Sequence, residues 1–135
     1  MDPSDALSYV TKNHHAVIAV RRQDGTPAMS PVLAGVLDGT IAISSRETAY
    51  KVKSLRRDPK AWLCVVPDKF FGTWIQIEAD VEIVSLPDAQ EPLVEYYRAV
   101  AGEHPDWDEY RSSLISERRV LLRLTPTAVG PTVSG

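Results

Sequence analysis

The chain has 135 residues, of which 44% are apolar and 24% are charged, and its formal net charge is −3 at pH 7. These values are typical of a soluble globular protein, and the length suits one domain, residues 1–135, with its own core. Two classes are disfavoured: no stretch approaches the roughly 20 apolar residues of a membrane span, and an acidic chain without an extended basic run does not suit nucleic-acid binding. No secretory signal is visible, so we expect a cytoplasmic protein.

The first third of the chain predicts a helix followed by three strands. An amphipathic helix is expected from Ser4 to Asn13, and the apolar run from His15 to Val20 is typical of a strand buried on both faces. Asp-Gly pairs at 24–25 and 38–39 predict tight hairpin turns. With a second strand at 27–37 and a third at 40–44, these turns indicate an antiparallel meander.

A short basic helix is expected to follow, between Ser44 and Pro59. Ser44 and Glu47 have the spacing of a capping box, and Ser45 lies beside this cap. The apolar stripe of the helix consists of Ala49, Val52 and Leu55. Its start is a candidate anion site, because free N–H groups and hydroxyls gather at the positive end of the helix dipole.

Basic residues outnumber acidic ones around this helix. They are Arg46, Lys51, Lys53, Arg56, Arg57 and Lys60, against Glu47 and Asp58. Helix geometry places Lys51 on the flank nearer the packed side, so Lys51 and Arg46 are candidates for contact with a phosphate or carboxylate group. The alternative, favoured for Lys53, Arg56 and Arg57, is a solvated face.

The rest of the chain predicts three further strands and two helices. Strands are expected at 61–66, 74–84 and 120–124, and helices at 88–101 and 106–116; the Pro- and Gly-containing tail at 125–135 is predicted to be partly irregular. Cys64, the one cysteine, is expected to be a buried, inert thiol. Strands joined mostly by hairpins favour a mainly β (α+β) antiparallel barrel of six strands with short flanking helices.

Common catalytic and metal-binding motifs are absent from the sequence. It contains no G-x-G-x-x-G, Walker A loop, H-E-x-x-H or paired C-x-x-C. Glu78, Asp80 and Glu82 share a strand face, for which solvation is favoured over a metal cluster. Pro31 lies mid-strand and has no N–H, which predicts an edge or a bulge. Exposed backbone there suits a planar ring, although an ordinary bulge is the alternative.

Several segments between Asn13 and Thr125 form a recognisable series. They are Asp24-Gly25-Thr26-Pro27, Met29-Ser30-Pro31-Val32, Lys51, Ser54-Leu55-Arg56-Arg57-Asp58-Pro59, Tyr97-Arg98, Ala101-Gly102-Glu103-His104, Asp106-Trp107-Asp108-Glu109-Tyr110-Arg111 and Arg118-Arg119-Val120-Leu121-Leu122. With them the chain resembles the split β-barrel superfamily of pyridoxamine-phosphate-oxidase-like flavoproteins. It is most similar to the mycobacterial and actinobacterial branch that uses the deazaflavin coenzyme F420.

This resemblance implies a homodimer with two cofactor sites at the subunit interface, holding coenzyme F420 or, alternatively, FMN. The residues implied to bind the cofactor are Met29, Ser30, Pro31 and Val32 at the ring, Ser44, Ser45, Arg46 and Lys51 at the phosphate, and Trp74 reaching from the partner subunit. No catalytic side chain is implied, because the cofactor carries the hydride and the protein positions it. The branch often has a second basic residue two positions before Lys51, where this chain has Ala49.

The function expected on this basis is an F420-dependent oxidoreductase that transfers hydride to an unsaturated small molecule. Two alternatives are an FMN-dependent oxidoreductase of the same fold and a non-catalytic protein that binds the cofactor.

Overall fold

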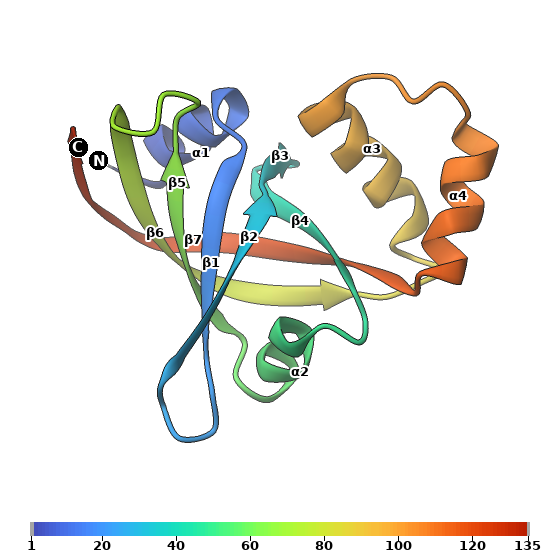
Figure 1. Cartoon of the computed structure of the whole chain (residues 1–135), viewed down its shortest axis with the longest axis horizontal. Coiled ribbons are helices and arrows are strands. Elements are labelled where there is room, and N and C mark those ends of the chain that lie inside the picture. Colours follow the sequence, from blue (N-terminus) through green and yellow to red (C-terminus); the bar gives the residue numbers. More distant parts are fainter. Residues whose placement is uncertain (1, 135) are drawn as a thin grey trace.

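The computed structural model describes residues 2–134, which form a curled seven-stranded antiparallel sheet and four helices (Figure 1). The strands are β1 (His15–Arg21), β2 (Pro27–Leu33), β3 (Gly35–Leu37), β4 (Thr40–Arg46), β5 (Lys60–Val66), β6 (Thr73–Val84) and β7 (Arg119–Ser134). The helices are α1 (Pro3–Lys12), α2 (Tyr50–Arg57), α3 (Gln90–Ala101) and α4 (Trp107–Ser116). The prediction of a mainly β antiparallel fold with short helices is confirmed.

The curl of the sheet follows from its strand order, β2-β1-β5-β6-β7-β4-β3. The two edge strands, β2 and β3, are separated in sequence only by Ala34, so the two edges must meet at this residue and the sheet must close on itself. Ala34 is fully buried, its N–H donates to the His14 carbonyl oxygen at 2.8 Å, and its own carbonyl oxygen accepts from His14 Nδ1 at 2.8 Å. We call this line, where β2 approaches β4, the seam.

The division at Ala34 corrects the predicted meander and the predicted six strands. The expected strand at 27–37 pairs with β1 through its first part and with β4 through its second part, so it is two strands. Pro31 lies in the regular part of β2, opposite Val17, and is tolerated because β2 is an edge strand. The prediction of a sheet edge at Pro31 is therefore confirmed. The change of partner strand, from β1 to β4, occurs three residues later, at Ala34.

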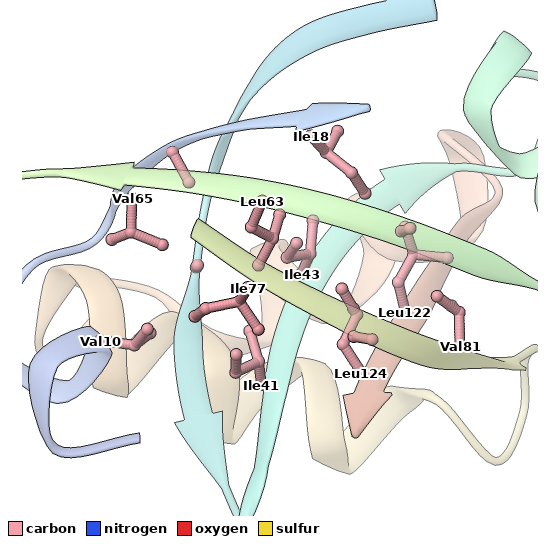
Figure 2. Packing of buried hydrophobic residues seen from close by; sticks show 14 of the residues in the cluster. Val10, Ile18, Ile41, Ile43, Leu63, Val65, Ile77, Val81, Leu122 and Leu124 are labelled. Carbon is pink, nitrogen blue, oxygen red and sulfur yellow. The ribbon is translucent and has the colours of Figure 1, made fainter. Parts of the chain in front are cut away.

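Two hydrophobic cores lie on opposite faces of the sheet. Figure 2 shows the first, inside the curl, where side chains from α1 and from the strands point toward one another. Its largest fully buried members are Ile18, Ile41, Ile43, Leu55, Leu63, Ile75, Ile77, Leu122 and Leu124. The second core lies outside β4 and β7, where α3 and α4 cover Ala42 and Leu121 with Leu93, Tyr96 and Leu114. In Figure 1, α3 and α4 stand side by side at this flank.

The apolar runs of the sequence differ in how they are covered. Ile41–Ile43 and Val120–Leu122 are buried on both faces, because each lies between the two cores. The run at 15–20 alternates instead: Ala16, Ile18 and Val20 are buried, while Val17 is 39% exposed. The prediction that this strand is buried on both faces is therefore wrong for the single chain.

The tail predicted to be irregular is the second half of β7. Beyond Leu124 this strand pairs with β6 as far as Thr73↔Ser134, and the described residues give it no partner strand on its other side. Pro126 and Pro131 lie near two register shifts in that pairing, where a missing N–H costs little. Turn-forming residues are thus accommodated by bulges.

Substitution of Ala34 by leucine should weaken the closure of the sheet. A fully buried alanine leaves no room for three further carbons, so we expect Ala34→Leu to lower the free energy of unfolding by about 1–3 kcal/mol. Urea denaturation measures this difference. Met29→Leu, at a 69% exposed position of the preceding strand β2, serves as the control and should change stability by less than about 0.5 kcal/mol. Equal effects of both changes would contradict the role given to Ala34.

Candidate functional site

The segment predicted to open the basic helix is instead the end of a strand. Ser44 and Ser45 belong to β4, whose pairing with β7 continues to Arg46↔Arg119. Helix α2 begins later, at Tyr50, and its N-cap residue, Ala49, makes no side-chain capping bond. The predicted capping box is therefore wrong, because the strand pairing begun by the Ile41–Ile43 run extends through the serines.

Glu47, the other expected member of that box, has a different partner. Its carboxylate accepts from the Arg56 guanidinium at 2.7 and 2.8 Å, which ties the β4–α2 turn to the helix. Val52 and Leu55 are buried as the predicted stripe requires, and Asp58 is the C-cap residue. Lys51 is consequently the second residue of a helix that is held against the barrel by its buried side chains and by the Glu47–Arg56 ion pair.

A pocket of about 280 Å³ lies between β2, the end of β4, α2 and the start of β7. Its lining consists of Pro31, Val32, Ser44, Ser45, Arg46, Ala49, Lys51 and Arg119. We call it the seam pocket. It brings together most of the residues predicted for cofactor binding, although they come from separate strands and a helix rather than from one helix start. Ser30 contributes as well, since Lys51 Nζ donates to Ser30 Oγ at 3.5 Å.

Lys51 carries a charge that nothing in the described residues neutralises. Its side chain is partly buried, and no carboxylate described by the structure lies within salt-bridge distance of Nζ. Burial, and secondarily the positive charge of Arg119, hold the pKa of the Lys51 ammonium below its usual value. A partly desolvated ammonium group beside an arginine is an electrostatic setting that an incoming anion stabilises.

The two arginines of the pocket share one carboxylate. Arg119 Nη2 lies 2.8 Å and Arg46 Nη2 lies 3.6 Å from Glu117 Oε1. Three cations, counting Lys51, therefore face a single acid, and the pocket keeps an excess of two positive charges. The Ser45 hydroxyl donates to the Arg46 carbonyl oxygen at 3.1 Å, whereas Ser44 also lines the pocket, and together with the cations its hydroxyl suits a phosphate group.

Arg119 is not among the residues predicted to bind the cofactor. It lies at the first position of β7, directly opposite Arg46, and this placement depends on the register between two strands more than 70 residues apart. In the sequence, Arg119 is visible only as a basic residue at the start of an apolar strand. Such a residue marks the end of the strand but does not indicate which residue of another strand lies opposite it. Arg46 also lines the pocket, so two arginines lie near the position at which this chain has Ala49.

Two of the predicted residues lie away from this pocket. Met29 is 69% exposed on β2, and Trp74 lies half-buried near the start of β6. Neither lines the seam pocket. Strand registers place both on the outer face of the sheet, together with Cys64. Cys64 is exposed, so the prediction of a buried thiol is wrong for this chain.

A second pocket, of about 460 Å³, adjoins the first and shares Ser44 and Arg119 with it. Its walls include Tyr96, Tyr97 and Tyr110 from α3 and α4. Tyr96 Oη donates to the Leu33 carbonyl oxygen at 2.7 Å, and burial raises the pKa of Tyr110 to about 12. Tyr110 is therefore neutral at pH 7. The two pockets together form a groove with a cationic part and an aromatic part.

The remaining polar candidates do not form a metal site. Lys60 Nζ lies 3.3 Å from Glu78 and 3.6 Å from Asp80, so this strand face is partly neutralised by a lysine. His104 packs among the rings of Tyr97, Trp107 and Tyr110. Within residues 2–134, no three metal-ligating side chains come together, and no helix is long and apolar enough to cross a membrane.

Comparisons with known proteins agree on the architecture. Residues 4–132 match a family model described as pyridoxamine 5'-phosphate oxidase. A conserved hypothetical protein, Rv2991 from Mycobacterium tuberculosis, aligns with a TM-score of 0.79 and 21% identity over 99% of this chain and 85% of that one. An F420 reductase aligns with a TM-score of 0.70 and 18% identity, covering 91% and 94%.

A third solved structure belongs to an FMN-binding protein related to pyridoxamine 5'-phosphate oxidase, from Nostoc punctiforme. It aligns with a TM-score of 0.64 and 16% identity over 94% of this chain and 76% of that one. At these identities the likenesses establish a shared fold.

Removal of the uncompensated charge should stabilise the ligand-free protein. Lys51→Met keeps most of the packed stem and removes the ammonium group, so we expect the free energy of unfolding to stay equal or to rise by up to about 1 kcal/mol. Lys12→Met, at an exposed position of α1 outside both cationic pockets, is the control and should have little effect. Thermal unfolding of both variants measures the difference. A marked loss of stability in Lys51→Met alone would indicate that Lys51 has a structural partner.

Proposed function

Because the chain belongs to the pyridoxamine 5'-phosphate oxidase family, we propose that it is an oxidoreductase that binds coenzyme F420 and reduces an unsaturated small molecule. The observation that carries this proposal is the seam pocket, in which Lys51 has no counter-ion among the described residues and Arg119 lies beside it. A phosphate group of the cofactor would supply the missing negative charge.

Different residues of the pocket would contact different parts of such a cofactor. Lys51, Arg46 and Arg119 attract the phosphate, and Ser44 and Ser30 offer hydroxyls at its edge. Pro31 and Val32 form an apolar wall that continues into a further pocket with Leu33, which suits a planar ring. The bound cofactor supplies hydride transfer, so the chain itself needs to orient the cofactor and exclude water rather than to provide an acid or a base.

FMN is the second candidate, because it also carries a phosphate and the same fold binds it in a related protein. Coenzyme F420 is preferred on the segments at 55–59 and 102–107 that resemble the deazaflavin branch. The second of these segments lies in the loop that packs His104 and Trp107 against Tyr97, near the aromatic part of the groove.

The outer face of β2, β1 and β5 supports a homodimer as the functional form. Cross-strand registers place nine residues on this face, three from each strand. They are Met29, Pro31 and Leu33 of β2, His15, Val17 and Ala19 of β1, and Trp62, Cys64 and Val66 of β5. All but His15 are apolar or weakly polar, and Val17, Met29 and Leu33 are 39%, 69% and 44% exposed. The other apolar runs in the sheet are covered on both faces, so we propose that a second copy covers this one.

This dimer would also complete the cofactor site. Pro31 and Leu33 belong both to the outer face and to the pocket next to the seam pocket. Trp74 continues the same face on β6, two residues from Gln76, which pairs with Cys64. A second copy docked there would bring its Trp74 toward the ring of the cofactor, as the proposed role of this residue requires.

The cofactor proposal is tested by comparing ligands with and without a phosphate. We expect Lys51→Met to weaken binding of coenzyme F420 or FMN about ten- to a hundredfold, because it removes one charge-assisted contact. Binding of riboflavin and of the phosphate-free deazaflavin should stay unchanged. Fluorescence titration of each ligand gives the four affinities, with the exposed Lys12→Met as the control.

The outcome of these titrations decides between the candidates. Tighter binding of F420 followed by its oxidation in the presence of unsaturated acceptors supports the reductase; tighter binding of FMN supports the second candidate. Binding without turnover over a broad acceptor panel points to a non-catalytic cofactor-binding protein. Unchanged affinities in Lys51→Met would remove Lys51 from the site.

The dimer is tested through a charged substitution on the outer face. Val17→Asp places a carboxylate in the middle of the proposed interface without disturbing the buried side of β1, and should convert dimer to monomer in analytical ultracentrifugation. The Cys64 thiol, shielded in a dimer, should then react at least about tenfold faster with a disulfide reagent. A wild-type monomer with a freely reactive Cys64 would contradict the proposal; Asp at exposed Thr11 is the control.

A further inference from the structure

A separate pocket of about 520 Å³ lies between α2 and the turn that joins β1 to β2. Helix α2 contributes Tyr50, Lys53, Ser54 and Arg57, whose spacing of three, four and seven residues places them on one helix face. The turn contributes Arg22 and Asp24. Lys51 and the other residues of the seam pocket line no part of it, so the two pockets lie on different flanks of the same helix.

The three cations of this pocket form no salt bridge with a carboxylate of the described residues, although Arg22 interacts with Asp24 at longer range. Arg22, Lys53 and Arg57 form no salt bridge there, whereas the arginines next to them in sequence do: Arg21 pairs with Asp58 at 2.8 Å and Arg56 with Glu47 at 2.7 Å. The chain as a whole is acidic, with a net charge of −3. A cluster of three cations without salt bridges is therefore unusual in this acidic chain, in which the neighbouring arginines are paired with carboxylates.

The one carboxylate at the pocket is engaged elsewhere. Asp24 accepts from Thr26 Oγ1 at 2.6 Å and from Thr26 N at 3.0 Å, and these hydrogen bonds lower the pKa of Asp24. Asp24 is thus an ionised part of the turn. With three positive charges and one negative charge, the pocket retains an excess of two positive charges.

Backbone contacts hold two of the guanidinium groups in place. Arg22 Nη1 donates to the Pro27 carbonyl oxygen at 2.8 Å, and Arg57 Nη2 donates to the Arg21 carbonyl oxygen at 2.6 Å. Each guanidinium has five N–H donors, so both keep donors for a ligand while their positions are restricted. Cations ordered in this way lose less conformational entropy when they bind an anion.

Ser54 provides an independent observation. Its side chain is 1% exposed and lines the pocket, yet its hydroxyl makes no hydrogen bond to any residue that the structure describes. A buried hydroxyl without a partner costs free energy in the folded protein. Such groups in native structures often indicate a missing water, ion or ligand.

We propose that this pocket binds a small polyanion that carries two or more phosphate or carboxylate groups. Arg22, Lys53 and Arg57 neutralise the charges, and the Ser54 hydroxyl donates a hydrogen bond at the base of the pocket. The site does not depend on the cofactor proposed for the seam pocket.

The test uses isothermal titration calorimetry of the whole chain with pyrophosphate and with citrate at fixed ionic strength. These probes separate phosphate from carboxylate recognition, and tighter binding of one identifies the group. Binding supports the site when the double variant at this pocket weakens it and Lys51→Met at the seam pocket does not. The double variant Lys53→Gln, Arg57→Gln should weaken binding at this pocket at least about tenfold. Lys51→Met, which alters only the seam pocket, should leave it unchanged.

Ser54→Ala provides a second signature that a nonspecific basic surface would not give. It should weaken probe binding and at the same time raise the melting temperature by about 3 °C, because it removes a buried, unpaired hydroxyl. The proposal is overturned if wild type binds neither probe at millimolar concentration. It is equally overturned if the double variant binds like wild type, or if Lys51→Met alone abolishes all binding.

Discussion

The separation of the two sheet edges by one residue is the constraint on which the rest of the structure depends. Ala34 forces β2 and β3 together, and this closure creates both an interior that the first core fills and a seam at which β2 lies against β4. Residues from distant parts of the chain meet at the seam, among them Ser30, Lys51 and Arg119. The candidate cofactor site is thus a product of the topology rather than of one local motif.

Short-range sequence patterns predicted most of the helices, strands and turns of the fold. The Asp-Gly pairs fixed two hairpins, because glycine adopts the positive φ that such turns need, and Gly25 and Gly39 have φ values of +87° and +75°. The alternation along β6 and the stripe of Val52 and Leu55 identified their buried faces correctly. For the candidate site, the motif around Pro31 and the basic residue Lys51 were identifiable from the chain alone.

What the sequence could not reveal depends on partners that lie far away along the chain. The serines at 44–45 have good capping chemistry, but pairing with β7 holds them in a strand. The role of Arg119 follows from its register with Arg46, and the length of β7 follows from bulges that accommodate its prolines. An apolar run such as 15–20 reports that both faces avoid water, and does not say whether its own chain or another provides the cover.

The seam also determines where the folded chain opens most readily. Each of β2 and β3 has a partner strand on one side only, so their outward N–H groups are protected less well than those of the central strands. A ligand that contacts β2, α2 and β7 at once acts as a clamp across this line, and its binding energy adds to the cost of opening. Slower hydrogen exchange of the backbone N–H groups of β2 and β3 would then indicate that the seam pocket is occupied.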